Sequence, residues 1–225
     1  MSFYRKFYNF FEPMVRRIYR IHADGCENIP EGGAILAANH TSFSDVIVIS
    51  AAAKRQVRYM AKKELFQTPL APLIRALGAF PVDRGGADVG SIRKTIQLIE
   101  EGELIGIFPQ GHRQGGKDPR TTEIKPGVGF ITCHTKAAVV PVFIHNSKMR
   151  TALFRKNTVT FGRPVTFEEL EPLVRGEKGR YDYSAAARIL FDRVCELYYG
   201  PALAEPEKPL ALKPGSVAPG NEVGK

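Results

Sequence analysis

The sequence has 225 residues, 44% of them hydrophobic, which is enough to bury the core of one domain. A formal net charge of +9 predicts an anionic partner, and charge alone leaves open nucleic acid, an acidic membrane surface or a phosphorylated small molecule. The three cysteines, Cys26, Cys133 and Cys195, are far apart and odd in number, so they indicate neither a disulfide framework nor a metal site. A reducing, cytoplasmic setting is therefore expected.

Residues 1–22 predict an amphipathic helix, or two short helices divided at Pro13. Arginines recur through this segment without a small-residue cleavage site after them, so a signal peptide is not expected. A terminal helix packed on the domain core would also be amphipathic, but the Phe, Tyr and Arg content favours a helix lying in the headgroup layer of an anionic membrane. The apolar sector holds Phe3, Phe7, Phe10, Phe11, Met14, Ile18 and Ile21, and the opposite side holds Arg5, Lys6, Arg16, Arg17 and Arg20.

From residue 33 onward, short apolar runs alternate with helical patterns, and no run approaches the roughly 18 to 20 apolar residues that a membrane-spanning helix needs. The expected buried strands are GAILAA, VRYMA, GAFPV, LIGIF, VVPVFI and TVTFG. Helices are expected at about 43–53, 63–77, 88–101, 126–136 and 185–199. This alternation predicts a single α/β domain over residues 23–200, with a mostly parallel or mixed central sheet flanked by helices. Residues 201–225 are rich in proline, glycine and alanine and predict a disordered tail.

The polar stretch NHTSFSD, residues 39–45, lies between two apolar runs. Ser42 as an N-cap and Asp45 in the first helical turn would explain part of it without any chemistry. His40 remains, and a turn through Thr41 could fold its imidazole back so that Asp45 accepts its N–H. An imidazole held in this way has one fixed tautomer and can act as a general base, while N–H groups at the helix start can stabilise an oxyanion. The spacing alone is equally compatible with a capped helix and with a functional pair.

Four blocks follow one another along the chain, NHTSFSD, GAFPVDR, FPQGHR and VVPVFI, with RYMAKKEL between the first two. Together they resemble the glycerolipid acyltransferases of the 1-acylglycerol-3-phosphate acyltransferase type, also called lysophosphatidate acyltransferases. NHTSFSD is similar to the first block of that family, asparagine-histidine followed by four residues and aspartate. FPQGHR stands where the family usually has FPEGTR. The resemblance covers about residues 20–165, and the amphipathic start is also similar.

The resemblance implies that His40 is the general base and that Asp45 orients it. The free hydroxyl of a lysophospholipid would attack an acyl thioester on coenzyme A or acyl carrier protein, without a covalent acyl-enzyme and without a metal or redox cofactor. With 1-acylglycerol-3-phosphate (lysophosphatidate) as acceptor, the product would be phosphatidate, in phospholipid biosynthesis. The protein is then expected to be a peripheral or monotopic membrane protein on the cytoplasmic face of the cell membrane.

The acceptor carries a phosphate, which arginine side chains can bind through two hydrogen bonds. Arg113 is the first candidate for this contact, and a solvated surface charge is the alternative for any single cation. The other residues expected at the acceptor or its phosphate are Gln110, Gly111, Arg84, Lys62 and Lys125. The third block departs from the family at Gln110, which replaces a glutamate, and at His112, which replaces a threonine, so the acceptor preference could differ. Residues 110–125 are expected to form a mobile rim.

Other functions compete with this interpretation. The chain could be an acyltransferase for a different lysolipid, or a thioesterase in which His40 activates water. The absence of a G-x-S-x-G motif disfavours a serine hydrolase. A noncatalytic protein that binds anionic lipid or nucleic acid would also fit the positive charge. Nucleic acid is not expected as a partner, because the aromatic residues beyond the first segment lie in apolar runs and form no stacking platform.

Overall fold

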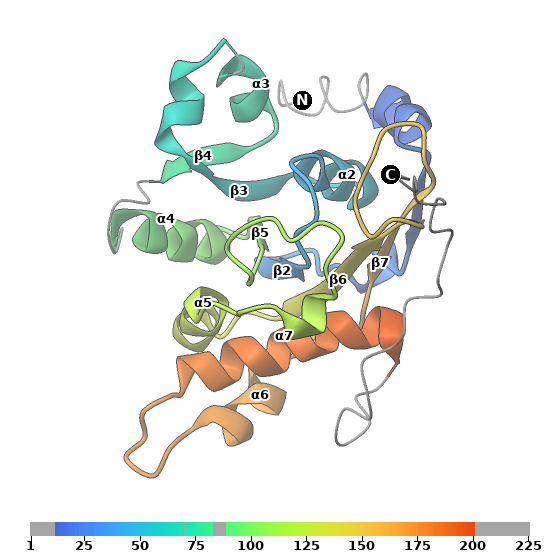
Figure 1. Cartoon of the computed structure of the whole chain (residues 1–225). Coiled ribbons are helices and arrows are strands. Elements are labelled where there is room, and N and C mark those ends of the chain that lie inside the picture. The colour runs from blue at the N-terminus through green and yellow to red at the C-terminus, as the bar shows by residue number, and fades with distance from the viewer. Residues whose placement is uncertain (1–11, 70, 83–88, 201–225) are drawn as a thin grey trace, which may run out of the picture.

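The computed structural model describes residues 12–69, 71–82 and 89–200. The described strands form one sheet in the order β1-β7-β6-β2-β5-β3-β4, and the only antiparallel neighbours among them are β6 and β7 (Figure 1). The strands are β1 (Ile21–Asp24), β2 (Ala34–Ala38), β3 (Val57–Lys62), β4 (Ala79–Val82), β5 (Leu104–Ile107), β6 (Val139–His145) and β7 (Asn157–Phe161). The predicted α/β fold with a mostly parallel or mixed sheet is confirmed.

Helices cover both faces of this sheet (Figure 1). Residues 12–18 are helical, and within the described residues no helix is both long enough and apolar enough to cross a bilayer. The other α-helices of the described residues are α2 (Asp45–Ala52), α3 (Ala71–Ala76), α4 (Val89–Glu100), α5 (Gly127–Thr135), α6 (Phe167–Val174) and α7 (Tyr183–Tyr199). Short 3-10 helices are η1 (Cys26–Asn28), η2 (Lys63–Gln67) and η3 (Pro119–Thr121).

The alternation of side chains along the central strand β2 explains the layers. Ala34 and Leu36 pack on one side with residues of α2, whereas Ile35 and Ala37 pack on the other side with residues of α4, α5 and α7. Both faces of the strand are therefore buried, which is why the central strands are continuous apolar runs in the sequence.

The six expected strands and the helices at the positions of α2, α4, α5 and α7 are all present. The predicted end of the N-terminal helix, at residue 22, was wrong. The helix stops at residue 18, and Ile21 begins β1, where it pairs with Asn157. The expected helix at 63–77 is divided into η2 and α3, since Thr68 precedes a proline and takes an extended conformation. Helix α6 was not predicted. The remaining part of the expected N-terminal helix and the expected tail lie outside the described residues.

The order of the strands determines where the functional loops lie. β2 is parallel to both β5 and β6, so the carboxyl ends of these three strands are at the same edge of the sheet. The chain leaves β2 at Asn39, β5 at Phe108 and β6 at Asn146. NHTSFSD, FPQGHR and the loop after VVPVFI therefore meet at one edge, the usual position of a ligand site in an open α/β sheet.

Candidate active site

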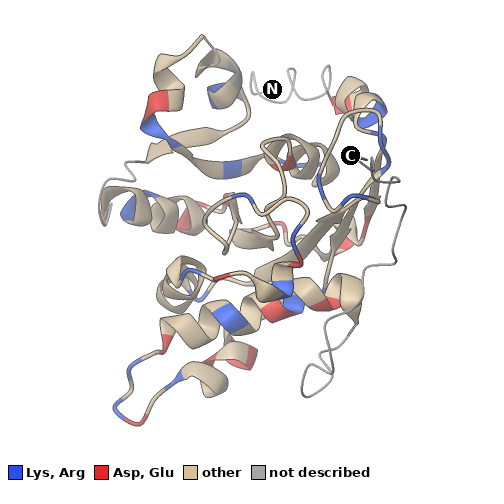
Figure 2. Cartoon of the chain, in the orientation of Figure 1, with Lys and Arg blue, Asp and Glu red and all other residues tan. Residues whose placement is uncertain are grey.

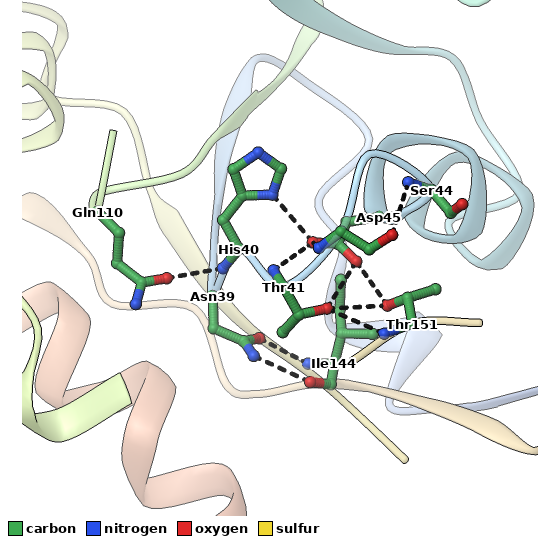
Figure 3. Close-up of polar contacts among 9 residues, drawn as sticks. Asn39, His40, Thr41, Ser44, Asp45, Gln110, Ile144 and Thr151 are labelled. Atoms are coloured by element: carbon green, nitrogen blue, oxygen red, sulfur yellow. Dashed lines mark hydrogen bonds and ion pairs between the residues drawn. The ribbon is translucent and has the colours of Figure 1, made fainter. Parts of the chain in front are cut away.

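Asn39 fixes the point at which β2 ends. Its amide Nδ2 donates to the carbonyl of Ile144 at 2.9 Å, and its Oδ1 accepts from the N–H of Ile144 at 2.7 Å (Figure 3). This pair of bonds continues the β2–β6 ladder beyond the pair Ala38 and Val142. Because Asn39 is buried, both bonds are shielded from water, and the turn that carries His40 begins from a fixed point.

The carboxylate of Asp45 lies at the centre of the candidate site, with no exposed surface. Its Oδ2 accepts from the N–H of Thr41 at 2.5 Å, from the N–H of Ser42 at 2.8 Å and from the imidazole of His40 at 2.9 Å. Its Oδ1 accepts from the hydroxyls of Thr41 at 3.0 Å and Thr151 at 2.5 Å (Figure 3). Five donors thus compensate a buried carboxylate that would otherwise be costly to remove from water.

The start of α2 differs from the expected cap. Ser44, not Ser42, is the N-cap, and α2 begins at Asp45. The carboxylate of Asp45 turns back onto the loop before the helix, so it occupies the N–H groups of Thr41 and Ser42. Within the described residues, the hydroxyl of Ser42 accepts only from the N–H of Ser44, at 3.3 Å. Asp45 therefore holds the loop in place, and the expected N-cap role of Ser42 is wrong.

The imidazole of His40 is held in one orientation, and its contact with Asp45, which the spacing in NHTSFSD left open and the family resemblance implied, is present. Its Nδ1 must carry the proton, because the carboxylate of Asp45 can only accept. The ring stacks on Phe108 with the ring centroids 4.0 Å apart and the planes 16° from parallel. The side chain is 16% exposed, and within the described part of the chain Nε2 has no hydrogen-bond partner. His40 therefore presents a lone pair on Nε2 with a fixed tautomer and a fixed ring plane.

The main chain of His40 is held by the third block. Its N–H donates to Oε1 of Gln110 at 2.7 Å (Figure 3). Its carbonyl accepts from the N–H of Gln114 at 2.8 Å. The other end of the Gln110 amide donates to the hydroxyl of Thr122 at 2.8 Å, and this side chain is 1% exposed. Gln110 was expected to contact the acceptor, but the structure buries it beside His40 with both ends of its amide bonded to the chain.

The far part of the loop 110–125, which the sequence predicted to be a mobile rim, contacts α7. The guanidinium of Arg120 lies 3.9 Å from the centre of the Tyr199 ring and bonds the carboxylate of Asp118. The hydrogen bond from Arg120 lowers the pKa of Asp118, and burial raises the pKa of Tyr199 to about 12. Thr122, which receives the Gln110 amide, donates to the carbonyl of Pro119 at 2.6 Å. These contacts connect the end of α7 to Gln110, the residue that bonds the main chain of His40.

Two of the residues expected at the acceptor or its phosphate, Gly111 and Arg113, lie within three residues after Gln110. Arg113 is exposed, has no ion-pair partner among the residues described, and precedes Gln114, whose N–H bonds His40. Gly111 is exposed and has φ +72, a left-handed conformation that suits glycine, and its N–H closes a turn onto the carbonyl of Phe108. Gln110 and Gln114 both bond the main chain of His40, and Gly111 and Arg113 are their immediate neighbours in the chain. Both residues therefore lie near His40.

The other cationic candidates are placed differently. Lys125 is exposed and pairs with Glu123 at 2.5 Å, and its Cγ would lie 3.3 Å from a Cβ added at Gly111. Lys62 is exposed at the end of β3, and no hydrogen bond or ion pair in the described part of the chain joins it to the site. Arg84 lies outside the described residues. The structure thus brings Lys125 near the third block and leaves Lys62 without a link to His40.

Thr151, Thr122 and Gln114 contribute to the site although sequence reasoning did not single them out. Thr151 is 106 residues from Asp45 along the chain, and its hydroxyl is buried against that carboxylate. No local pattern marks such a residue. The available signal was the fourth block itself, because the loop after a parallel strand next to β2 must leave the sheet near the loop after β2.

Several known proteins are similar to this chain in sequence or in fold. A family model described as Acyltransferase matches residues 20–145. The 1-acyl-sn-glycerol-3-phosphate acyltransferase of Bacillus subtilis is 33% identical over 176 residues, covering 76% of this chain and 84% of that protein. The protein of the same name from Streptococcus pneumoniae is 27% identical over 159 residues, covering 68% of this chain and 58% of that protein.

Among solved structures, the 1-acyl-sn-glycerophosphate acyltransferase PlsC of Thermotoga maritima has the same fold. It aligns with a TM-score of 0.60 at 22% identity, over 92% of this chain and 86% of that one. The family match spans more than half of the sequence, and it includes the His40–Asp45 pair and the Gln110 support. The chain therefore belongs to the acyltransferase family, as an enzyme of the 1-acylglycerol-3-phosphate acyltransferase type.

Proposed function

We propose that this acyltransferase moves an acyl chain from a thioester to the free hydroxyl of 1-acylglycerol-3-phosphate and so forms phosphatidate. The donor would be acyl-coenzyme A or acyl carrier protein, and the reaction would take place at the cytoplasmic face of the cell membrane. The observation that carries the proposal is the His40 imidazole, bonded to Asp45 through Nδ1 and unbonded at Nε2 within the described residues. The names of the relatives support this acceptor.

In the proposed reaction this imidazole moves the proton between the two substrates. Nε2 of His40 takes the proton of the acceptor hydroxyl while the oxygen attacks the thioester carbonyl. The carbon–sulfur bond then breaks, and the thiolate takes the proton back from the imidazolium. The products are an ester and a free thiol, and His40 is neutral again. Asp45 stabilises the imidazolium that exists between the two proton transfers, because its carboxylate is already bonded to Nδ1.

Arg113 is proposed to bind the phosphate of the acceptor. It is exposed, follows the Gln110 support of His40 by three residues and has no described ion-pair partner to be displaced. A guanidinium can donate two parallel hydrogen bonds to a phosphate. Lys125 would first have to leave Glu123, so we expect a smaller contribution from it. Lys62 and Arg84 remain further candidates.

An acyl-transfer assay that crosses both donors with several lysolipid acceptors tests this function, with His40→Ala as the blank. The expected result is acceptor-dependent release of one thiol for each ester formed, with the highest kcat/KM on 1-acylglycerol-3-phosphate. Preference for another lysolipid would reject the acceptor and retain the reaction. Release of free fatty acid at a rate independent of the acceptor would show a thioesterase and contradict the proposal.

A further inference from the structure

Three segments that are distant in the sequence form one surface beside His40. The hydroxyl of Tyr19, just after the first described helix, donates to the hydroxyl of Ser44 at 3.0 Å. The N–H of Phe154 donates to the carbonyl of Ile18 at 2.8 Å, and Thr151 bonds Asp45. The helix at residues 12–18, the loop 40–45 and the loop 147–156 are thus bonded to one another. Each of them exposes a large apolar side chain: Met14, Phe43, Leu153 and Phe154.

The loop 147–156 has a fixed shape although it exposes most of its side chains. Buried Asn146 accepts from the N–H groups of Lys148 and Arg150. Buried Asn157 donates to the carbonyl groups of Ala152 and Arg155 at 2.8 and 2.9 Å. Two internal side chains therefore satisfy the backbone of the loop. Its outward residues are held in place without using their own polar groups.

Phe154 is an unfavourable choice for its position unless it has a partner. Its φ is +58, in the left-handed region where a bulky side chain costs roughly 1–2 kcal/mol and where glycine or asparagine would be easier. It is also 72% exposed, and the neighbouring Leu153 is 51% exposed. Neither packing nor backbone geometry accounts for two adjacent large apolar side chains on this rigid loop.

Basic side chains surround these apolar residues. The sequence contains no Asp or Glu between Glu123 and Glu168. Figure 2 shows basic residues along the loop and the adjoining helix, and Leu153 and Phe154 line a hollow together with Arg20, Arg155 and Lys156. The exposed cations of the three segments, none with an ion-pair partner among the described residues, are Arg17, Arg20, Lys148, Arg150, Arg155 and Lys156.

We propose that this surface docks on an anionic lipid bilayer, with Leu153 and Phe154 entering the headgroup layer. Aromatic and aliphatic side chains ringed by cations are the combination that such a layer binds, because it offers apolar depth and negative charge together. The proposal rests on the proposed function, in which the acceptor is a membrane lipid. Since Thr151 belongs to the same rigid loop and bonds Asp45, docking would hold the His40–Asp45 pair at a fixed height above the lipid. An acidic acyl carrier protein could bind the cations of this surface, but its binding would not explain the two adjacent exposed apolar side chains.

The first test uses the absence of tryptophan from the sequence. Phe154→Trp puts a single fluorophore on the docking surface, and Leu173→Trp puts one on α6, where the native leucine is also exposed. With phosphatidylglycerol vesicles, the Phe154→Trp emission should shift to the blue and be quenched by brominated lipid chains, whereas Leu173→Trp should do neither. Unchanged emission of Phe154→Trp while the protein sediments with the vesicles would overturn the proposal, and so would a failure to sediment.

The second test compares two double variants that remove the same charge. Arg155→Gln/Lys156→Gln changes the docking surface, and Lys178→Gln/Arg180→Gln changes the exposed turn between α6 and α7. The first should bind phosphatidylglycerol vesicles roughly tenfold to thirtyfold more weakly and the second should not, since each basic residue near an anionic surface contributes about 1 kcal/mol. Equal binding by the two variants would contradict lipid docking. Unchanged vesicle binding with transfer lost only from acyl carrier protein would assign the surface to that protein instead.

Failure of the proposed function can be told apart from failure of the docking surface. A water-soluble, short-chain 1-acylglycerol-3-phosphate needs no bilayer, so Arg155→Gln/Lys156→Gln should use it at the wild-type rate. If wild-type protein does not acylate this acceptor while Phe154→Trp still enters the vesicle, the proposed function fails and the docking surface stands. If transfer proceeds but Phe154→Trp stays in water, the docking surface fails alone.

Discussion

The loops 39–45 and 147–156 leave neighbouring parallel strands at the same edge of the sheet, but they use their polar groups in opposite ways. In the first loop, donors converge on one buried carboxylate, and the imidazole of His40 is one of them. In the second loop, two buried asparagines satisfy the backbone, so the cations and apolar side chains point outward without described partners. The first loop thus directs most of its polar groups inward, whereas the second exposes cations and apolar side chains to the bilayer proposed above.

This difference separates two kinds of contribution to an enzyme. A reaction centre benefits from groups that are already oriented, because reorganisation during the reaction would cost free energy. A docking surface must instead leave its binding groups free. Thr151 connects the two, since it belongs to the second loop and bonds the carboxylate of the first. Substitutions in and around the two loops should therefore have effects of clearly different size and kind.

Asp45→Asn should have the largest of these effects, because it breaks the first loop at its centre. The amide removes the negative charge and turns an NH2 group toward donors that need an acceptor. We expect kcat to fall by about 10²- to 10⁴-fold and the free energy of unfolding to fall by about 2–4 kcal/mol. Steady-state acyl transfer and urea unfolding measure the two. Wild-type kcat in a folded Asp45→Asn protein would show that the carboxylate does not orient the base.

Gln110→Leu should come next, since it removes the support of the His40 main chain and leaves the imidazole contact with Asp45 intact. The His40 N–H would be left unbonded, which costs about 1–3 kcal/mol. A displaced base should lower kcat by roughly ten- to a hundredfold with little change in KM. Gln110→Glu is the matched control, because its carboxylate still accepts from that N–H, and kcat should stay within about tenfold of wild type. Equal losses in the two variants would contradict a positioning role.

Thr151→Val tests the connection between the two loops. Valine has nearly the same shape but does not donate to Asp45, so the free energy of unfolding should fall by about 1 kcal/mol. We expect kcat to fall severalfold, while vesicle binding is unchanged. Thr95→Val is the control, because among the described residues that buried hydroxyl bonds only the carbonyl of Ser91 within α4. A loss of kcat as large in Thr95→Val would mean that general stability, not the link to Asp45, sets the effect.

Asp118→Asn should have the smallest effect and the clearest pH dependence. The folded state lowers the pKa of Asp118 from its ordinary 3.8, so the ionised carboxylate stabilises the fold above about pH 4, and this stabilisation is lost as the pH falls through the lowered pKa. The side chain is partly exposed, so the variant should be less stable than wild type by under about 1 kcal/mol at pH 7. The difference should shrink in acid. A stability difference between the variant and wild type that grows as the pH falls would contradict the predicted direction of the pH dependence.

The sequence predicted the parts of the molecule that depend on nearby residues. His40 and Asp45 are five positions apart, so one turn brings them together, and the buried strands are unmistakable apolar runs. β1 was missed because it is a four-residue edge strand that is only half buried. For α6, the capping box of Thr166 and Glu169 was an available signal, although Pro172 inside the helix obscured it.

The supports of the site could not be predicted in the same way. The contacts of Gln110 with His40 and Thr122, and of Thr151 with Asp45, depend on the order of strands in the sheet. The cap at Ser42 was wrong for a related reason. A carboxylate in the first turn can bond the loop before it or the helix after it, and the buried hydroxyls of Thr41 and Thr151 favour the loop. A single sequence does not show that these hydroxyls are near.

The central claim is that Nε2 of His40 removes the proton of the acceptor hydroxyl. Its most direct test is kcat/KM for acyl transfer in His40→Ala beside His134→Ala, in which the lost histidine is exposed on α5 and bonds the carbonyl of Phe130. His40→Ala should fold, bind vesicles as wild type does and lose about 10²- to 10⁴-fold in kcat/KM, while His134→Ala keeps the wild-type value. A folded His40→Ala protein that transfers acyl chains within about threefold of the wild-type rate, well inside the range expected for a lost general base, would contradict the account.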